Sequence, residues 1–202
     1  MGYANDTALY NVFKKKYQYT PSEYKEQITR NKKFITDKIN CQIEMLKETP
    51  IIFLSYIGDY DNFSSSVFEE DSWDKLYDFA FSQNVLLENE EYWGICYDNQ
   101  EITDPDKCRF YACLTISNLI QPKITDEIKC MIIPSAQYAV FTYVGAYDGL
   151  DHFYDTAIQS IPSKYRLSDN LILEHYLNSS TDTPETELVT ELWIPIIQES
   201  TI

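Results

Sequence analysis

Glycine is scarce in this sequence, with five residues among 202, and histidine is scarcer still, with two. No glycine-rich phosphate-binding loop, dinucleotide fingerprint or nucleophile elbow occurs, so nucleotide-dependent and serine-hydrolase chemistry are not indicated. His152 and His175 lie too far apart in sequence to form a local metal motif. We therefore predict that the protein uses no metal and no other cofactor.

Basic residues are also few, because 16 Lys and Arg compare with 32 Asp and Glu, which gives a net charge of −16. Residues 1–40 hold eight basic and four acidic residues, whereas the remainder holds eight basic and 28 acidic residues. Phosphate backbones require Lys and Arg, so most of the chain is not a nucleic-acid surface. The acidic remainder either serves solubility or raises the local concentration of cationic ligands.

Long apolar runs are absent, so no segment is predicted to span a membrane, and no apolar leader opens the sequence. The five cysteines are an odd number and include no C-x-x-C pair, which is typical of reduced thiols. These features together predict a cytoplasmic protein that does not bind membranes.

Residues 1–26 carry three short motifs: Gly2-Tyr3, Phe13-Lys14-Lys15 and Pro21-Ser22-Glu23-Tyr24. They resemble the end of an AraC-type DNA-binding domain, although Gln18 stands where that family has glycine. A coincidental amphipathic helical hairpin is the alternative. The AraC-type family uses two helix-turn-helix units, and only the tail of the second is matched. We therefore predict no specific DNA binding by this chain alone.

Residues 27–42 are predicted to be a polar linker, and residues 43–202 to be one domain with an internal repeat. The segment Tyr56-Ile57-Gly58-Asp59-Tyr60-Asp61 is echoed by Tyr143-Val144-Gly145-Ala146-Tyr147-Asp148. Each copy follows an apolar, strand-like run and precedes apolar residues at helical spacing. The two halves, about 43–122 and 129–202, continue with further strand-like segments: 92–97 and 109–116 in the first, 171–176 and 188–194 in the second.

Each half therefore has the pattern strand–helix–strand–strand. Such a unit buries one sheet face under its helix, and two units side by side leave other faces free to line a shared groove. The predicted fold class is α+β, with two pseudo-symmetric repeats that form antiparallel sheets with a groove between them, preceded by a short N-terminal helical segment.

Several motifs within these halves resemble the GyrI-like, or effector-binding, domain. The resemblance implies a domain that binds lipophilic, often cationic, compounds. Some members of that family regulate transcription, and some that lack a DNA-binding part hydrolyse electrophilic toxins. The motifs are Trp73-Asp74-Lys75-Leu76, Gly94-Ile95-Cys96-Tyr97-Asp98-Asn99, Ile102-Thr103-Asp104-Pro105, Arg109-Phe110-Tyr111-Ala112-Cys113, Tyr138-Ala139-Val140-Phe141, Gly145-Ala146-Tyr147 and Thr190-Glu191-Leu192-Trp193-Ile194-Pro195-Ile196.

Glu191 is the first candidate for a binding residue, because it is a carboxylate in an otherwise apolar closing strand. Strand alternation puts it on one face with Val189 and Trp193, where a dry, unpaired charge would be costly. Either solvent or a cation must therefore reach it. We align Glu191 with Ala112 of the first half, so that only one half carries a charged anchor. The resemblance also implies a ligand-facing glutamate here, and an ordinary exposed strand residue is the alternative.

Aromatic side chains around one carboxylate would form a cage for a delocalised cation, since each ring attracts a cation by about 0.5–2 kcal/mol. For any single ring the alternative is core packing, and we assign Trp73 to the helix core. The candidate ligand-binding aromatics are Trp193, Trp93, Tyr111, Tyr138, Tyr143, Tyr147 and Phe53.

We therefore expect a non-enzymatic binding module for lipophilic cations, of the kind used as a transcription-regulator effector domain or a multidrug sensor. The alternative is a hydrolase of electrophilic small molecules, in which Glu191 activates a water and a tyrosine assists the leaving group. A protein-interaction domain without a pocket is the third possibility.

Overall fold

The computed structural model of the chain describes residues 39–60, 67–98, 103–117 and 125–199. The predicted helical segment 1–26 and most of the predicted linker lie outside these residues. The domain begins slightly before the predicted boundary at 43, because Ile39 and Cys41 pack against an apolar cluster of the domain. Within the described part of the chain, no helix is long and apolar enough to cross a membrane.

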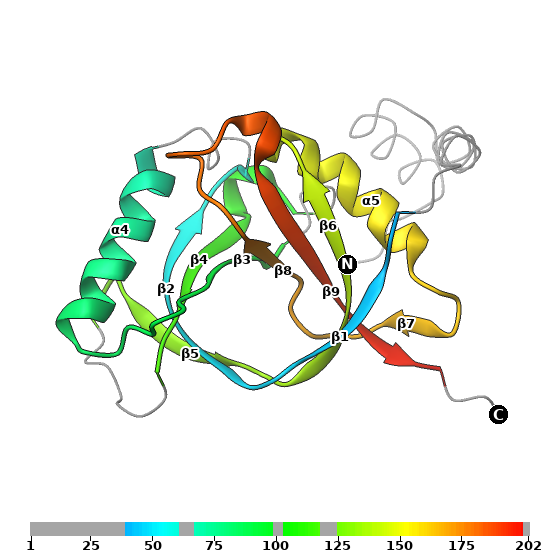
Figure 1. Cartoon of the computed structure of the whole chain (residues 1–202), viewed down its shortest axis with the longest axis horizontal. Coiled ribbons are helices and arrows are strands. Elements are labelled where there is room, and N and C mark those ends of the chain that lie inside the picture. The colour runs from blue at the N-terminus through cyan, green and yellow to red at the C-terminus, as the bar shows by residue number, and fades with distance from the viewer. Residues whose placement is uncertain (1–38, 61–66, 99–102, 118–124, 200–202) are drawn as a thin grey trace, which may run out of the picture. The chain divides into compact units, whose positions relative to one another are not determined.

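The first half of the domain follows the predicted order of strand, helix, strand and strand, with one strand added at its start (Figure 1). Helix α4 packs on β2 and β4 through Leu76 and Ala80, which are fully buried. The elements are β1 (Gln42–Leu46), β2 (Thr49–Ile57), α4 (Val67–Ser82), β3 (Tyr92–Cys96), the 3-10 turn η1 (Pro105–Lys107) and β4 (Arg109–Thr115).

The second half repeats this order and adds two strands, β5 at its start and the short β7 after its helix (Figure 1). Helix α5 packs on β6 and β9, with Ala157 buried against Phe141 and its neighbours. The elements are β5 (Lys129–Ile133), β6 (Ala136–Val144), η2 (Tyr147–Gly149), α5 (Leu150–Ser160), β7 (Tyr165–Leu167), β8 (Leu173–Tyr176), η3 (Glu185–Glu187) and β9 (Val189–Gln198).

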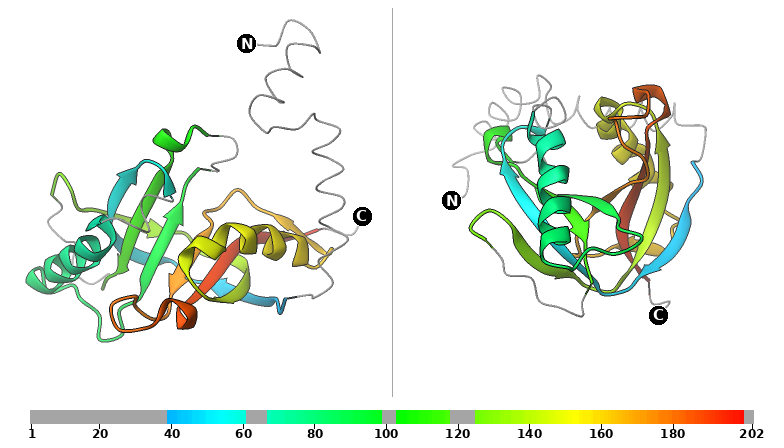
Figure 2. Two further views of the ribbon diagram at one scale, coloured as in Figure 1. Left: turned by 90° about the horizontal axis from the view of Figure 1, so that it is seen from above. Right: turned by 60° about the vertical axis from the view of Figure 1, so that its left-hand side comes forward.

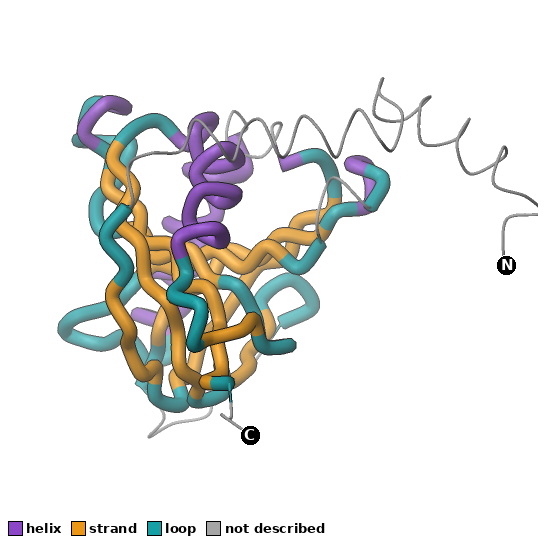
Figure 3. The backbone as a smooth tube through the Cα atoms, turned by 90° about the vertical axis from the view of Figure 1, so that its right-hand side faces the viewer, coloured by secondary structure: helices purple, strands orange, loops and turns teal. Residues whose placement is uncertain are grey.

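All of these strands belong to one nine-stranded antiparallel sheet in the order β1-β6-β9-β8-β3-β4-β2-β5, with β7 paired to β9. The two halves meet where β3 pairs with β8. The sheet curls, so that the strands of the two halves turn toward each other (Figures 2 and 3). The predicted α+β class with two pseudo-symmetric repeats is confirmed, although the repeats share one sheet.

A long ribbon also joins the halves. In it, β1 and β2 run antiparallel to β6 and β5. The pairing runs from Gln42 opposite Val140 to Phe53 opposite Lys129 without a change of register. Each half therefore completes the sheet of the other.

The repeat is close enough that β2 and β6 have the same burial pattern, residue by residue. Ile52 of β2 pairs with Leu114, and Ala139 of β6 pairs with Ile194, so Leu114 and Ile194 are equivalent. Counting back along both strands makes Tyr111 the counterpart of Glu191. The predicted alignment with Ala112 is therefore wrong by one residue. The equivalent turns η1 and η3 begin at Pro105 and Glu185, and each ends two residues before its strand starts.

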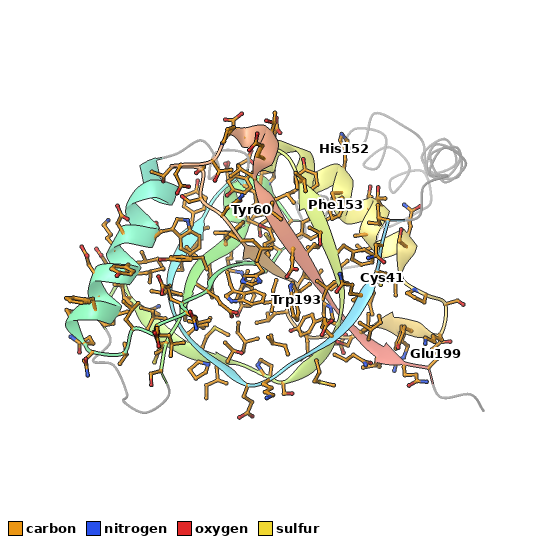
Figure 4. All side chains as sticks on the ribbon, in the orientation of Figure 1. Cys41, Tyr60, His152, Phe153, Trp193 and Glu199 are labelled. Carbon is orange, nitrogen blue, oxygen red and sulfur yellow. The ribbon has the colours of Figure 1, made fainter. Side chains whose placement is uncertain are left out.

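The two faces of the sheet carry different apolar clusters. One face is covered by α4 in the first half and by α5 in the second, on either side of β3 and β8. We call this the helix face. The other, inner face holds a third cluster that fills the curl of the sheet, where Trp193 points inward (Figure 4). Its buried members are Ile51, Phe53, Trp93, Ile95, Cys113, Ile133, Tyr138, Val140 and Leu173.

Candidate functional site

The centre of the helix face holds a buried carboxylate, Glu174 of β8, which is 6% exposed. Tyr154 of α5 donates a hydrogen bond to Oε1 at 2.6 Å, and Tyr176 of β8 donates one to Oε2 at 2.6 Å. The thiol of Cys96 in β3 lies 3.6 Å from Oε1 as a third donor. Hydrogen bonds to an ionised group are short and strong, so three neutral donors hold this acceptor in place without a cation.

The same environment affects the three donors. Burial is the main cause that raises the pKa of Tyr154, Tyr176 and Cys96 well above the usual values, and the nearby Glu174 raises them further. All three groups therefore keep their protons at neutral pH. They act as hydrogen-bond donors to Glu174 and not as anions.

The strand pairing identifies the residue of the first half that corresponds to Glu174. Gly94 pairs with Ala112 in the first half, and Glu174 pairs with the equivalent Leu192 in the second, so Gly94 is the counterpart of Glu174. The two residues also face each other directly across β3 and β8. A Cβ atom at Gly94 would lie only 2.5 Å from the Tyr176 hydroxyl oxygen. Glycine at this position therefore leaves the room that the Tyr176 side chain occupies.

A cleft of about 790 Å³ opens above this carboxylate. Glu174 is not among its lining residues, whereas Tyr176, which donates a hydrogen bond to Glu174, is. The lining residues are Trp73, Asp74, Tyr77, Glu90, Glu91, Tyr92, Tyr147, His175, Tyr176, Leu177, Asn178, Ser179, Ser180 and Thr181.

The aromatic wall of the cleft is connected by edge-to-face contacts. The ring of Trp73 lies 5.7 Å from Tyr92 and 5.8 Å from Tyr176, measured between centroids. Tyr147 contacts the other side of Tyr176 at 5.6 Å. Such pairs keep ring faces available for a ligand, and rings attract cations through those faces.

The polar part of the wall is acidic. Asp74, Glu90 and Glu91 line the cleft, and its described lining contains neither lysine nor arginine. His175 is the one lining side chain that can become cationic, and it lies 3.4 Å from Glu191 Oε2 on the inner-face side. Anions are therefore disfavoured in the cleft, while an apolar cation meets aromatic rings and carboxylates together.

The structure places only Tyr147 of the predicted ligand-binding residues in this cleft. Glu191, Trp193 and Trp93 lie together, but on the inner face. The Trp193 indole donates to Glu191 Oε2 at 3.0 Å, and the Trp93 and Trp193 rings are 5.4 Å apart. His175 stacks on Trp93 with the ring centroids 4.0 Å apart.

The other predicted aromatics pack elsewhere. Phe53 and Tyr111 stack on each other at 4.6 Å, and Tyr138 is fully buried against Trp193. Tyr143 donates its hydroxyl to the Ala146 carbonyl in the turn before η2. The alternation that groups Glu191 with Trp193 is correct, but the curled sheet turns that face into core, away from the cleft. Glu191, Trp193 and Trp93, which form the centre of the predicted cage, therefore do not line this cleft.

Most members of the site were missed from the sequence, and Trp73 and Glu174 are the two that bear most on the site. Trp73, assigned to the helix core, contributes to the cleft wall while it packs against the core. Glu174 follows directly after three apolar residues in the run Leu171-Ile172-Leu173-Glu174-His175-Tyr176, and a carboxylate in an apolar strand is the same signal that selected Glu191. Among the residues that the structure describes, no three His, Cys, Asp or Glu side chains are placed to hold a metal ion.

Comparisons with known proteins agree with this architecture. The model of a family described as the GyrI-like small molecule binding domain matches residues 39–197. A search of curated proteins finds no significant match.

Among solved structures, EcmrR in a complex with DNA has a TM-score of 0.67 at 15% identity, over 88% of this chain and 65% of that chain. The chain thus spans less than two thirds of that protein. The EcmrR C-terminal domain has a TM-score of 0.60 at 16% identity, over 80% and 99% of the two chains. A hydrolase from Listeria innocua has a TM-score of 0.60 at 14% identity, over 84% and 98%. At identities this low, the structural similarity establishes a shared fold and nothing more.

Proposed function

Because the chain belongs to the GyrI-like small-molecule-binding family, we propose that its cleft binds lipophilic cations and that Glu174 is the counter-ion. The observation that carries this proposal is a buried carboxylate beneath an aromatic cleft, with three further carboxylates in the cleft wall. The predicted ligand class is kept, while the predicted anchor moves from Glu191 to Glu174.

Both parts of the cleft favour such a ligand. Burial of apolar ligand surface contributes about 25 cal/mol per Å², and each ring face adds about 0.5–2 kcal/mol toward a cation. A charge close to Glu174 interacts through protein and not through bulk water, where Coulomb attraction is several times weaker. Neither contribution demands a single ligand shape, so a range of apolar cations would fit.

The test is a fluorescence titration with crystal violet, a lipophilic triarylmethane cation, beside its uncharged leuco form. The wild-type protein should bind the cation more tightly than the leuco form. Glu174→Gln should weaken binding of the cation at least about tenfold, because the counter-ion is lost. Glu191→Gln is the matched control: it removes the same charge from the neighbouring strand on the inner face, and should change affinity less than about threefold.

Equal affinity for the two dyes would refute the electrostatic part of the proposal. A large loss in Glu191→Gln, with none in Glu174→Gln, would return the anchor to its predicted position.

The regulatory role of such a domain is also a proposal. An effector domain links ligand binding to transcription when it is joined to DNA-binding helices, and the described residues share the fold of the EcmrR C-terminal domain. The absence of specific DNA binding by this chain alone stays a prediction. A mobility shift at nanomolar protein and low salt would refute it.

Hydrolysis is the second candidate, and the short contact between Glu174 and Tyr176 is the observation that favours it. A carboxylate could orient water, and a phenol could assist a leaving group. However, the raised pKa of Tyr176 makes it a reluctant proton donor at neutral pH. Product formation from a strained-ring electrophile, lost in Glu174→Gln, would establish turnover.

A further inference from the structure

We propose that Tyr176 is a removable cap on Glu174, and that its hydroxyl occupies the place which the cationic part of a ligand takes. This inference rests on the proposed function. It makes Tyr176 a residue that limits the affinity for cations, because its hydrogen bond to Glu174 must be broken before a cation can take its place.

Each oxygen of Glu174 accepts a hydrogen bond from a tyrosine, so a ligand that takes the place of one of these donors gains direct contact with the charge. The two phenols are not equivalent in this respect. Tyr154 comes from α5, contacts Oε1, and is not part of the cleft wall. Tyr176 contacts Oε2 and lies in the wall, between the rings of Trp73 and Tyr147. The cleft therefore meets Glu174 through Tyr176.

Displacing the cap has a cost that depends on ligand charge. A hydrogen bond from a neutral donor to a buried carboxylate is worth more than an ordinary one, and an uncompensated buried carboxylate is unfavourable. An uncharged apolar ligand offers nothing to Oε2, so Tyr176 stays in place and the ligand contacts only rings. A cation replaces the lost hydrogen bond with direct charge compensation. The Tyr176 hydroxyl thus reduces the affinity for cations, and it supplies a hydrogen bond to Glu174 Oε2 when no cation is bound.

The lack of a side chain at Gly94 leaves room for the Tyr176 hydroxyl to reach Glu174. A Cβ atom there would lie 2.5 Å from the Tyr176 hydroxyl oxygen and 2.9 Å from the Phe110 ring. The pseudo-symmetric counterpart of the anchor is therefore the residue that leaves space for its cap. Gly94→Ala should push the hydroxyl off Oε2 without removing it.

The experiment titrates crystal violet and its leuco form against wild type, Tyr176→Phe and Tyr154→Phe, at a pH near 8. Tyr176→Phe should bind the cation about tenfold more tightly or better, since no hydrogen bond must be broken. Its affinity for the leuco form should be unchanged or lower. Tyr154→Phe is the matched control: it removes the other phenolic donor, which the ligand does not displace, and should change the affinity for the cation less than about threefold.

Gly94→Ala, checked for folding by thermal unfolding, should shift affinity for the cation in the same direction as Tyr176→Phe. Unchanged or weaker binding of the cation by Tyr176→Phe, or equal tightening by both phenylalanine variants, would overturn the cap. If one of these outcomes is found while wild type binds the cation and Glu174→Gln weakens that binding, the cap is refuted and the proposed function stands. If no protein, wild type or variant, binds the cation, the proposed function fails as well.

Discussion

Replacing Gly94 by alanine should destabilise the domain through two effects that the structure separates. Forcing a methyl group into a packed site costs about 1–3 kcal/mol. Here the new carbon would meet the Tyr176 hydroxyl oxygen at 2.5 Å and the Phe110 ring at 2.9 Å. Displacing that hydroxyl also breaks its bond to Glu174, and a hydrogen bond to a charged, buried acceptor contributes about 1.5–3 kcal/mol. The total expected loss is about 2.5–6 kcal/mol.

The measurement is equilibrium unfolding in urea for Gly94→Ala, Tyr176→Phe and the double variant. In the phenylalanine background the hydroxyl is already gone, so the alanine meets only Phe110 and should cost about 1 kcal/mol. The double-mutant cycle should then show a coupling energy of about 1.5 kcal/mol or more. Additive losses, within about 0.5 kcal/mol, would show that Gly94 and Tyr176 do not compete for the same space and would refute the reasoning.

Three further outcomes are expected. Leu76→Ala should lower the free energy of unfolding in urea by about 2–5 kcal/mol, since Leu76 of α4 is fully buried against the sheet. A loss below about 1 kcal/mol would contradict that packing. Trp73→Ala should weaken crystal violet binding about two- to thirtyfold, which is the contribution of one ring face to cation binding. Unchanged affinity would show that Trp73 does not contact the ligand. The folded protein should lose stability as the pH rises above the ordinary tyrosine pKa of 10.0, because burial raises the pKa of Tyr154 and Tyr176 only in the folded state. Thermal unfolding between pH 8 and 11 measures this loss, and Tyr154→Phe should make the alkaline slope shallower; an unchanged slope would refute the assignment.

The repeat was predictable because its signals are local. The copies around Gly58 and Gly145 sit at the same place in each half, after a long strand and before a helix, and the structure retains both. The added strands were not predictable. β1 and β5 are only five residues each and β7 only three, so each is too short to show a clear hydrophobic period. Their strand conformation comes from pairing with distant partners, which overrides weak local preference.

The position of the candidate site could not be predicted from the sequence pattern. Alternation correctly divided β9 into two faces, but it does not say which face of a curled sheet turns inward. Glu191 and Glu174 are both carboxylates in apolar runs, and sequence alone gave no reason to prefer the second. The distinction depends on tertiary partners: Tyr154 of α5 contacts Glu174 within the second half, and Cys96 of β3 contacts it only after the halves have joined.

The ribbon that joins the halves has a consequence for how the protein folds. Gln42 can pair with Val140 only after synthesis has reached the second half, and β3 must likewise wait until β8 has been synthesised. Contacts between such distant positions close large loops, and chains dominated by them fold slowly. A ribosome-bound first half would expose the unpaired edges of β1 and β3, which are sites for aggregation. The duplicated halves should therefore behave as a single cooperative unit, with neither half stable when expressed alone.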